Sequence, residues 1–278
     1  MKKISRRSFL AAAGLSVAAL ALTACGGSAS SVASSVASSA SSAAASTSAA
    51  AGELTTVEAG KLTMATNAAF PPYEMTTDSG EFEGIDIETA QAIADKLGLE
   101  LQIDDMDFDA ALLSVQQGKA DIVMAGVTVT DERKAVMDFS DSYATGIQSV
   151  IVPEGSDIAS PDDLAGKKIG TQRGTTGYIY CSDDFGDENV VAYDDGLTAV
   201  QALNNGQVDA VVIDNAPAQE FIAANPGLKI LDTSYAEEDY AIGMAKNSPL
   251  EDAVNSALEE LKADGTLQAI VDKYITAE

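Results

Sequence analysis

The chain has 278 residues, with 16 Lys and Arg against 43 Asp and Glu and a formal net charge of −27. This acidic balance argues against nucleic acid as a partner, because binding to a phosphate backbone depends on clustered cations. The chain contains no His, which excludes His-based catalytic triads and argues against zinc sites. The acidic run at 104–109 lacks the Gly and terminal Glu of a calcium loop and is interpreted as a solvated turn. We expect neither a metal nor a cofactor.

The first residues have the form of an export signal. Basic residues precede an apolar run at 9–24, which is shorter than the roughly 20 residues that a membrane span needs. Cys25 follows "LTA" directly, and this arrangement resembles the lipobox of bacterial lipoproteins. We therefore expect residues 1–24 to be a signal peptide, and Cys25 to carry a lipid that anchors the chain at the cell membrane, on its extracytoplasmic face. The alternative for Cys25 is an ordinary small residue of the signal.

The export route stays open, and a tether follows the signal. "SRRSFL" resembles a twin-arginine motif, but Ala11 stands where a Lys often follows, so ordinary secretion is also compatible. Residues 25–52 are almost wholly Ser, Ala, Gly and Thr, with too little apolar bulk to offset the entropy of ordering them. We expect a flexible tether that spans roughly 30 Å.

The first part of the globule predicts alternating strands and helices. A strand is expected over 61–67. Two helices follow it, the first over 84–98 and the second over 108–117. After Gly118, the almost unbroken apolar run at 121–126 is typical of a strand covered on both faces. The first helix is expected over 84–98, and its apolar stripe, which stops before Gly98, consists of Ile85, Ala90, Ile93, Ala94 and Leu97.

The stretch "GVTVTDER" at 126–133 ends in a cation that is unusual for its position. Thr130 is an N-cap candidate for a helix that begins at Asp131. Arg133 therefore falls in the first turn, where the macrodipole favours anions and a cation costs roughly 0.3 to 1 kcal/mol. An anion bound at Arg133 would offset that cost. The alternative is that Asp131, Glu132 or a solvent-facing rotamer absorbs the charge.

The second part of the globule repeats the alternation. Strands are expected over 166–172 and 208–214, and helices over 178–185 and 197–206. Gly265 separates two final helices, whose apolar stripes consist of Val254, Ala257, Leu258 and Leu261, and of Leu267, Ile270, Val271 and Tyr274.

Two segments share one pattern. "VQQGKADIVMAG" at 115–126 and "LNNGQVDAVVID" at 203–214 both run from a helix end through Gly and Asp into an apolar strand. The pattern suggests two lobes built to a similar plan. Gly126 and Asp214 would then follow equivalent buried strands, at the edge where open α/β sheets present their ligand sites. The alternative is two unrelated helix-to-strand turns that both use Gly.

Six motifs occur in order, within a resemblance that covers nearly everything from 61 to 274: "TNAAFPPYE", "GIDIETAQAIADKLG", "MDFDAAL", "AGVTVTDERKAVMDFSDSY", "RGTTG" and "GQVDAVVID". They resemble the polar amino-acid binding proteins of ABC importers, the extracellular solute-binding proteins of family 3, and are similar to the glutamine- and histidine-binding proteins. The resemblance implies an α/β, two-lobed periplasmic-binding-protein-like (type II) fold, each lobe a mostly parallel sheet flanked by helices. The first lobe would combine 53–144 with 241–278, and the second would be 145–240. "SYATGIQ" and "EEDYAIG" would form a two-segment hinge.

The same resemblance implies how an amino acid is held. Arg133 would clamp its α-carboxylate through the planar guanidinium, and Asp214 on the other lobe would accept its α-ammonium. Gly126 would offer backbone groups and Thr128 a hydroxyl and an N–H. Thr175 and Thr176, which precede a helix, would also bind the carboxylate, because helix N-termini favour anions. Since the cation and the anion belong to different lobes, only closure of the lobes engages both.

The side-chain end of the site is less specific. Phe70 and Phe108 would wall the ligand and exclude water, with core packing as the alternative for either. Asn67 stands where several relatives that bind basic ligands have an Asp, and this favours a neutral amino acid. Gln172 and Ile213 replace the Lys and His of glutamine binders. Arg173 could attract an acidic side chain or point to solvent.

The expected function is that of a monomeric, membrane-anchored binding protein that delivers an amino acid to ABC permease subunits, and is not an enzyme. An extracellular enzyme of the dehydratase type is the alternative on this scaffold, with Glu74 as its one candidate proton donor. A sensor or adhesion module is another. Cys181 is interpreted as a small buried hydrophobe, with a reactive thiol as the alternative.

Overall fold

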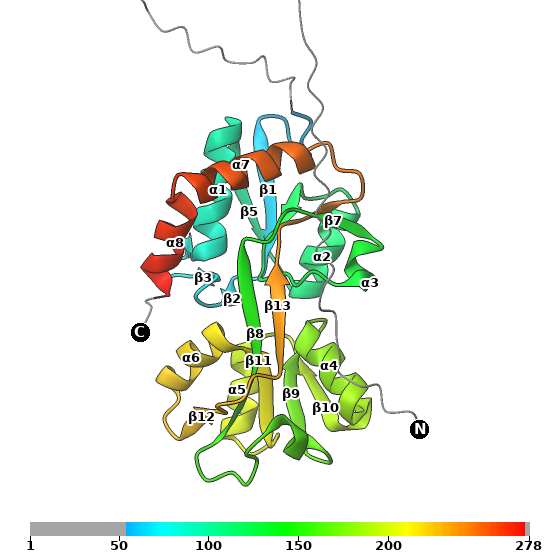
Figure 1. Ribbon diagram of the computed structural model, residues 1–278, viewed down its shortest axis with the longest axis vertical. Helices are drawn as coiled ribbons and strands as arrows, with labels where there is room; N and C mark the ends of the chain where they lie inside the picture. Colours follow the sequence, from blue (N-terminus) through cyan, green and yellow to red (C-terminus); the bar gives the residue numbers. More distant parts are fainter. Residues whose placement is uncertain (1–53, 276–278) are drawn as a thin grey trace, which may run out of the picture. The chain divides into compact units, whose positions relative to one another are not determined.

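The structure is a computed structural model that describes residues 54–275. The expected signal peptide at 1–24, Cys25 and the tether at 25–52 lie outside the described residues. Within 54–275, two separate main sheets are each flanked by helices, and two paired strands of the second sheet extend towards the first (Figure 1). No helix of this described part has the length and apolar character needed to cross a bilayer.

The first lobe is built on a five-stranded sheet with the order β5-β1-β6-β14-β7. Its parallel neighbours β5, β1 and β6 lie at one edge, and β14 and β7 complete it in antiparallel pairing. A small antiparallel sheet of β2, β3 and β4 follows β1 in the chain. The bounds are β1 Lys61–Thr66, β2 Ala69–Phe70, β3 Glu74–Thr76, β4 Phe82–Glu83, β5 Glu100–Asp105, β6 Ile122–Val123, β7 Met137–Phe139 and β14 Gly243–Ala245.

Helices bury both faces of this sheet. Helices α1 (Ile85–Leu97), α7 (Glu251–Ala263) and α8 (Thr266–Tyr274) share one core cluster with Leu62 and Met64 of β1. Helix α2 (Phe108–Gln116) packs in another cluster with Ala65 of the same strand. Because neighbouring β1 residues serve opposite faces, the strand is buried from Leu62 to Thr66. The helices expected over 84–98 and 108–117 are thereby confirmed.

The second lobe is built on a six-stranded sheet. Its order is β10-β9-β11-β8-β12, and β13 also pairs with β8. The bounds are β8 Ala144–Pro153, β9 Ile169–Gln172, β10 Val190–Tyr193, β11 Ala210–Asp214, β12 Leu228–Ile230 and β13 Ala236–Tyr240, with helices α4 Thr176–Phe185, α5 Gly196–Asn204 and α6 Asn215–Ala224 and 3-10 turns η1 Pro161–Leu164 and η2 Asp187–Asn189.

Cys181 of α4 lies in the core of the second lobe. Its side chain is fully buried among apolar residues of the sheet, including Val150 and Ile169. Burial raises the pKa of the thiol to about 12, which disfavours the thiolate that a reactive cysteine needs. The residue therefore packs as a small hydrophobe.

The two main sheets follow one plan. In each, two parallel neighbours precede a central strand, β6 or β11, beyond which the pairing becomes antiparallel. The internal similarity of 115–126 and 203–214 is thus confirmed as a repeat of topology. It also corrects one expectation, because the sheets are mixed rather than mostly parallel. The antiparallel strands arise where β8 and β14 enter their sheets from the crossing segments rather than from a helix.

The crossing segments are strands β8 and β13 of the second sheet, which lie side by side and extend towards the first lobe (Figure 1). Their register runs from Ala236 opposite Gln148 to Tyr240 opposite Ala144. Tyr240 also bridges to Thr128 of the first lobe. The expected lobe boundaries at 144/145 and 240/241 stay a prediction.

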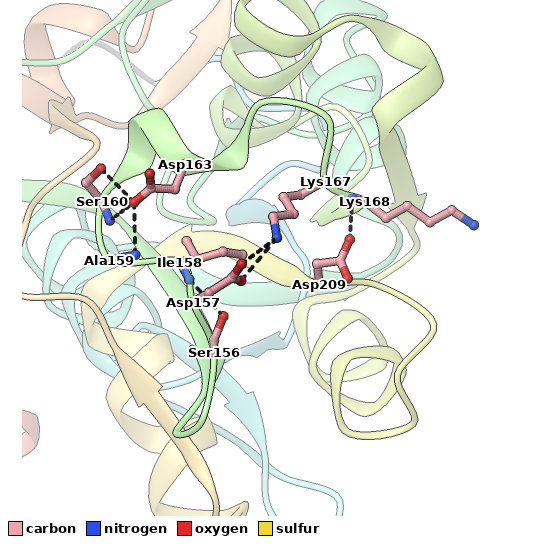
Figure 2. Close-up of polar contacts among 9 residues, drawn as sticks. All are labelled: Ser156, Asp157, Ile158, Ala159, Ser160, Asp163, Lys167, Lys168 and Asp209. Atoms are coloured by element: carbon pink, nitrogen blue, oxygen red, sulfur yellow. Dashed lines mark hydrogen bonds and ion pairs between the residues drawn. The ribbon is translucent and has the colours of Figure 1, made fainter.

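The loop from β8 to β9 is held by side-chain caps (Figure 2). Ser160 and Asp163 form a capping box at η1, and one Asp163 carboxylate oxygen accepts from the N–H of Ala159 at 3.0 Å. Lys167 pairs with Asp157 at 3.1 Å. These contacts lie near the start of β9, and Gln172 at the other end of this strand lines the site described next.

Candidate functional site

A cavity lies where the carboxyl ends of strands from both main sheets meet. Its lining combines residues of the first lobe, the second lobe and both crossing strands. All nine residues expected to bind a ligand line it: Asn67, Phe70, Phe108, Gly126, Thr128, Arg133, Thr175, Thr176 and Asp214. The remaining lining residues are Glu74, Ala125, Gln148, Gln172, Val212, Ile213 and Tyr240.

Arg133 reaches this cavity from the four-residue helix α3 (Asp131–Lys134). Thr130 is the N-cap, and its hydroxyl oxygen accepts from the Arg133 N–H at 3.2 Å. The side chain is 9% exposed and turns inward, where Nη1 donates to the carbonyl of Thr128 at 2.8 Å and Nη2 to that of Gly174 at 3.2 Å. Burial lowers the pKa of the guanidinium, but an arginine keeps its charge at neutral pH. A buried cation therefore faces the cavity.

Asp214 brings a buried anion to the same cavity from the end of β11. One carboxylate oxygen accepts from the N–H of Ile147 at 2.7 Å, and the other caps α6 by accepting from the N–H of Ala216 at 3.0 Å. The side chain belongs to a residue only 2% exposed. Burial raises its pKa to about 6, because the loss of water outweighs these hydrogen bonds. Near neutral pH the site therefore holds a carboxylate that a ligand cation would stabilise.

The lobes touch directly across the cavity. Besides the Arg133 contact with Gly174, the hydroxyl oxygens of Thr128 and Thr176 lie 3.4 Å apart. Thr175 is the N-cap of α4, whose first N–H groups lack intrahelical acceptors, and both Thr175 and Thr176 line the cavity. This arrangement suits a bound carboxylate.

Asn67 and Gln172 form another contact between the lobes. Gln172 Nε2 donates to Asn67 Oδ1 at 2.8 Å, and Asn67 Nδ2 donates to the carbonyl of Met106 at 3.0 Å. Both amides are thus engaged at the cavity wall. Ile213 lines the cavity as an apolar surface, whereas Arg173 is exposed, does not line it and pairs with Asp194 at 3.4 Å.

The two expected aromatic walls also pack in the cores. Phe108 is 6% exposed in the first-lobe core, and its ring centroid lies 5.4 Å from the Arg133 guanidinium carbon. Phe70 packs against core clusters of both lobes and stacks on Tyr73. The core-packing and cavity-lining interpretations therefore both hold for these residues.

Some residues at the site were not assigned a binding role from the sequence. Glu238 of β13 accepts from the Thr128 hydroxyl and from Gln148 Nε2, both at 3.0 Å. Tyr240 is almost fully buried at the cavity. The signal for both residues was their place in the expected hinge segment "EEDYAIG", which brings side chains as well as backbone to the cleft.

Glu74 also lines the cavity, although the sequence suggested it only as a proton donor for the enzyme alternative. It is fully buried, and burial raises the pKa of its carboxyl well above the usual range. No group of three or more Cys, Asp or Glu side chains suited to a metal ion occurs within 54–275.

Two α/β lobes, joined by paired crossing strands around a cleft with one buried cation and several buried carboxyls, define a two-lobed ligand-binding protein. The chain belongs to the bacterial extracellular solute-binding proteins, family 3, whose profile matches residues 62–277.

Relatives of this chain match it over most of their length. The chain is 33% identical to the L-cystine-binding protein TcyJ of Escherichia coli (strain K12) over 80% of this chain and 85% of the relative. It is 32% identical to the arginine-binding extracellular protein ArtP of Bacillus subtilis over 78% and 87%. The crystal structure of the arginine-, lysine-, histidine-binding protein ArtJ from Geobacillus stearothermophilus superposes with a TM-score of 0.75 at 34% identity, covering 78% of this chain and 96% of that chain.

Proposed function

We propose that this chain captures a free amino acid by closure of its two lobes and delivers it to the permease of an ABC importer. The observation that carries the proposal is that Arg133 and Asp214, from different lobes, line one cavity. A zwitterion offers a carboxylate to the first and an ammonium to the second. Neither lobe alone holds both partners, so binding favours the closed arrangement.

The other lining residues complete this assignment. Thr128, Thr175 and Thr176 offer hydroxyl and N–H groups to the α-carboxylate beside Arg133, and Gly126 offers backbone groups. Phe70 and Phe108 exclude water from the ion pairs, which strengthens them. Asn67 provides no counter-charge for a cationic side chain, yet the named relatives bind cystine, arginine, lysine or histidine. Which amino-acid side chain the site accepts must therefore be determined by experiment.

A thermal-shift panel of the twenty amino acids and cystine tests the proposal. A ligand that binds only the folded chain stabilises it by about 2.7 kcal/mol at a concentration of 100 Kd. We expect at least one free amino acid to raise the melting temperature, with micromolar or tighter affinity by calorimetry. A panel without any shift contradicts amino-acid capture. Turnover of a bound compound in the same samples would instead favour the dehydratase-type enzyme.

Delivery to an importer has a separate test in cells. Deletion of the gene should reduce uptake of the amino acid found in the panel, and the wild-type gene should restore it. A variant that cannot bind the amino acid should not restore uptake. Undiminished uptake in the deletion strain contradicts the importer role while leaving ligand capture intact.

We also infer how the chain is held at its place of action. Residues 1–24 would be removed on export, Cys25 would carry the lipid, and residues 25–52 would tether a monomeric globule outside the membrane. The support is the lipobox-like "LTAC" and the family of extracellular proteins to which the chain belongs.

A further inference from the structure

Glu74 is a buried carboxyl at the cavity wall without a hydrogen-bond partner. It lies at the start of β3, is fully buried and lines the cavity. Neither of its carboxyl oxygens has a hydrogen-bond donor among the described residues. A buried carboxyl is strongly destabilising unless it is neutralised or paired. Its environment therefore calls for a proton or a cation that the surrounding protein does not supply.

A second buried acid, Asp86, increases the need of Glu74 for a proton or a cation. Asp86 of α1 is also fully buried, and one of its oxygens accepts from the Gly126 N–H at 3.0 Å and from the Tyr143 hydroxyl at 2.8 Å. Its other oxygen has no partner among the described residues. Each of the two acids influences the pKa of the other. Glu74 and Asp86 therefore form a pair at the cavity, and only Glu74 lines the cavity itself.

The charges around the pair are mostly negative. The titratable groups that face it are Tyr73, Tyr143, Asp105 and, across the cavity, Asp214 and Arg133. Arg133 is engaged with two carbonyls, and no Lys or Arg of the described residues forms an ion pair with Glu74 or Asp86. Burial raises the pKa of Glu74 well above its usual range and that of Asp86 to about 6. Close to neutral pH the pair consequently retains a proton.

We propose that Glu74 is a second anionic contact for the ligand: its carboxylate binds a cationic nitrogen of the amino acid, and the proton shared with Asp86 leaves to solvent when the ligand binds. This rests on the proposed function. The cation replaces the proton, so that the total charge of the buried pair and its bound cation after binding equals the charge of the protonated pair before binding. The nitrogen is either the α-ammonium, shared with Asp214, or a cationic group of the side chain.

Titration calorimetry at pH 7.5 in phosphate and in Tris measures the proton release, because the two buffers differ in ionisation enthalpy. The probes are L-glutamine, L-arginine and L-cystine, together with deaminated arginine (5-guanidinopentanoic acid). At this pH Asp214, with a pKa of about 6, is almost fully ionised and contributes little. We expect the wild-type chain to release about one proton per bound ligand. Binding of arginine without proton release overturns the proposal and needs no variant, because arginine carries both of the cationic groups that Glu74 could contact.

The variant Glu74→Gln tests the residue itself. It preserves the shape of the side chain, and its amide can donate to Asp86, so the fold should be retained. We expect it to bind about 10- to 100-fold more weakly, as for loss of a charged hydrogen bond, and to release no proton. The control Glu83→Gln changes an exposed acid on the adjacent strand β4 and should match the wild type. Unchanged affinity and proton release in Glu74→Gln refute the assignment.

The probes separate the two sources of the cation. Proton release with glutamine as well as arginine assigns the α-ammonium, whereas release with arginine and its deaminated analogue assigns the guanidinium. Either result supports the cationic contact. If amino acids bind but none of them, arginine included, releases a proton, the amino-acid function stands and the role of Glu74 falls. If none of the panel binds, both fall.

Discussion

At the scale of single residues, burial decides what each charge at the cleft can do. Arg133 lies in the first turn of a helix, where a cation is usually exposed to solvent. Its side chain is instead buried against Phe108 and two carbonyls. Both carboxylate oxygens of Asp214 accept from backbone N–H groups, which lowers the pKa, and yet the pKa of this residue is raised. In both cases desolvation is the larger effect. A ligand of opposite charge relieves it, which is the physical basis of the binding proposal.

Replacing Arg133 with Ala should reduce amino-acid affinity by about 2 to 5 kcal/mol, because the ligand carboxylate would be buried without its partner. Calorimetry with the amino acid found in the panel measures the loss. Lys134→Ala is the matched control, since Lys134 is the next residue of the same helix but is exposed. Equal affinities for Arg133→Ala and the wild type would contradict the carboxylate assignment.

Replacing Asp214 with Asn should weaken amino acids more than their deaminated analogues. The amide oxygen of Asn can still cap α6, but the negative charge for the ammonium is lost. In the wild type, affinity should fall as pH drops below about 6, because the ligand binds only ionised Asp214, whose pKa is about 6. Competition binding across pH 5 to 8 measures both effects. Equal losses for amino acids and deaminated analogues would refute the amine role.

At the scale of elements, the repeated sheet order explains why the cleft is where it is. Strands β6 and β11 are both central, and each is followed by residues that line the cavity. The paired strands β8 and β13 connect the sheets, and their side chains Gln148 and Tyr240 line the same cavity. A change in the pairing of β8 with β13 is therefore expected to alter both stability and affinity.

Gly146 of β8 offers a test of that pairing. A Cβ added there would meet the buried ring of Tyr240, with the hydroxyl oxygen at 2.5 Å. Gly146→Ala should therefore destabilise the chain by about 1 to 3 kcal/mol, as overpacking does, and should weaken ligand binding. Gly155→Ala in the same lobe is the control, because no atom lies within 4 Å of its added Cβ. Denaturant titration and calorimetry compare the two, and equal stability would show that Tyr240 moves freely.

At the scale of the whole molecule, local patterns predicted the elements and the ordered motifs predicted the two-lobed fold. Apolar stripes predicted α1, α7 and α8, because helix packing leaves a period in the sequence. Local patterns and motifs did not predict the antiparallel strands of the two sheets, because the direction of a strand depends on how the chain returns to its sheet. For the same reason the contacts of Glu238 and the isolation of Glu74 were not foreseen. Glu238 meets Thr128, which is distant in sequence, and the missing hydrogen-bond donors of Glu74 follow from how the surrounding elements pack, which leaves no local pattern.

Membrane attachment belongs to the whole chain and depends on Cys25. If Cys25 carries the lipid, Cys25→Ser should move the protein from the membrane fraction to the medium or the extracytoplasmic fluid, while ligand binding by the globule stays unchanged. Fractionation and immunoblotting of cells measure this. Cys181→Ser is the control, since that thiol is buried in the second lobe. Retention of the Cys25 variant in the membrane would contradict lipid anchoring.

The pH dependence of stability follows from the buried acids. The folded chain raises the pKa of Asp86 and Asp214 from 3.8 to about 6, so between about pH 4 and 6 it binds more protons than the unfolded chain. Stability must then rise as pH falls through that window. Acidification also reduces the magnitude of the net charge of −27, and the weaker repulsion between like charges likewise stabilises the folded chain. Exposed acids whose pKa is lowered, such as Asp163 and Asp264, oppose this only weakly.

We therefore expect the melting temperature of the ligand-free chain to be higher at pH 5 than at pH 7, and the gain from a saturating amino acid to be smaller at pH 5. The second effect follows because the ligand needs Asp214 ionised. Scanning calorimetry measures both. In Asp214→Asn the rise on acidification should be smaller, whereas in Asp239→Asn, an exposed position on β13, it should match the wild type. A melting temperature that falls from pH 7 to pH 5 would show that the buried carboxyls are compensated by groups other than the ligand.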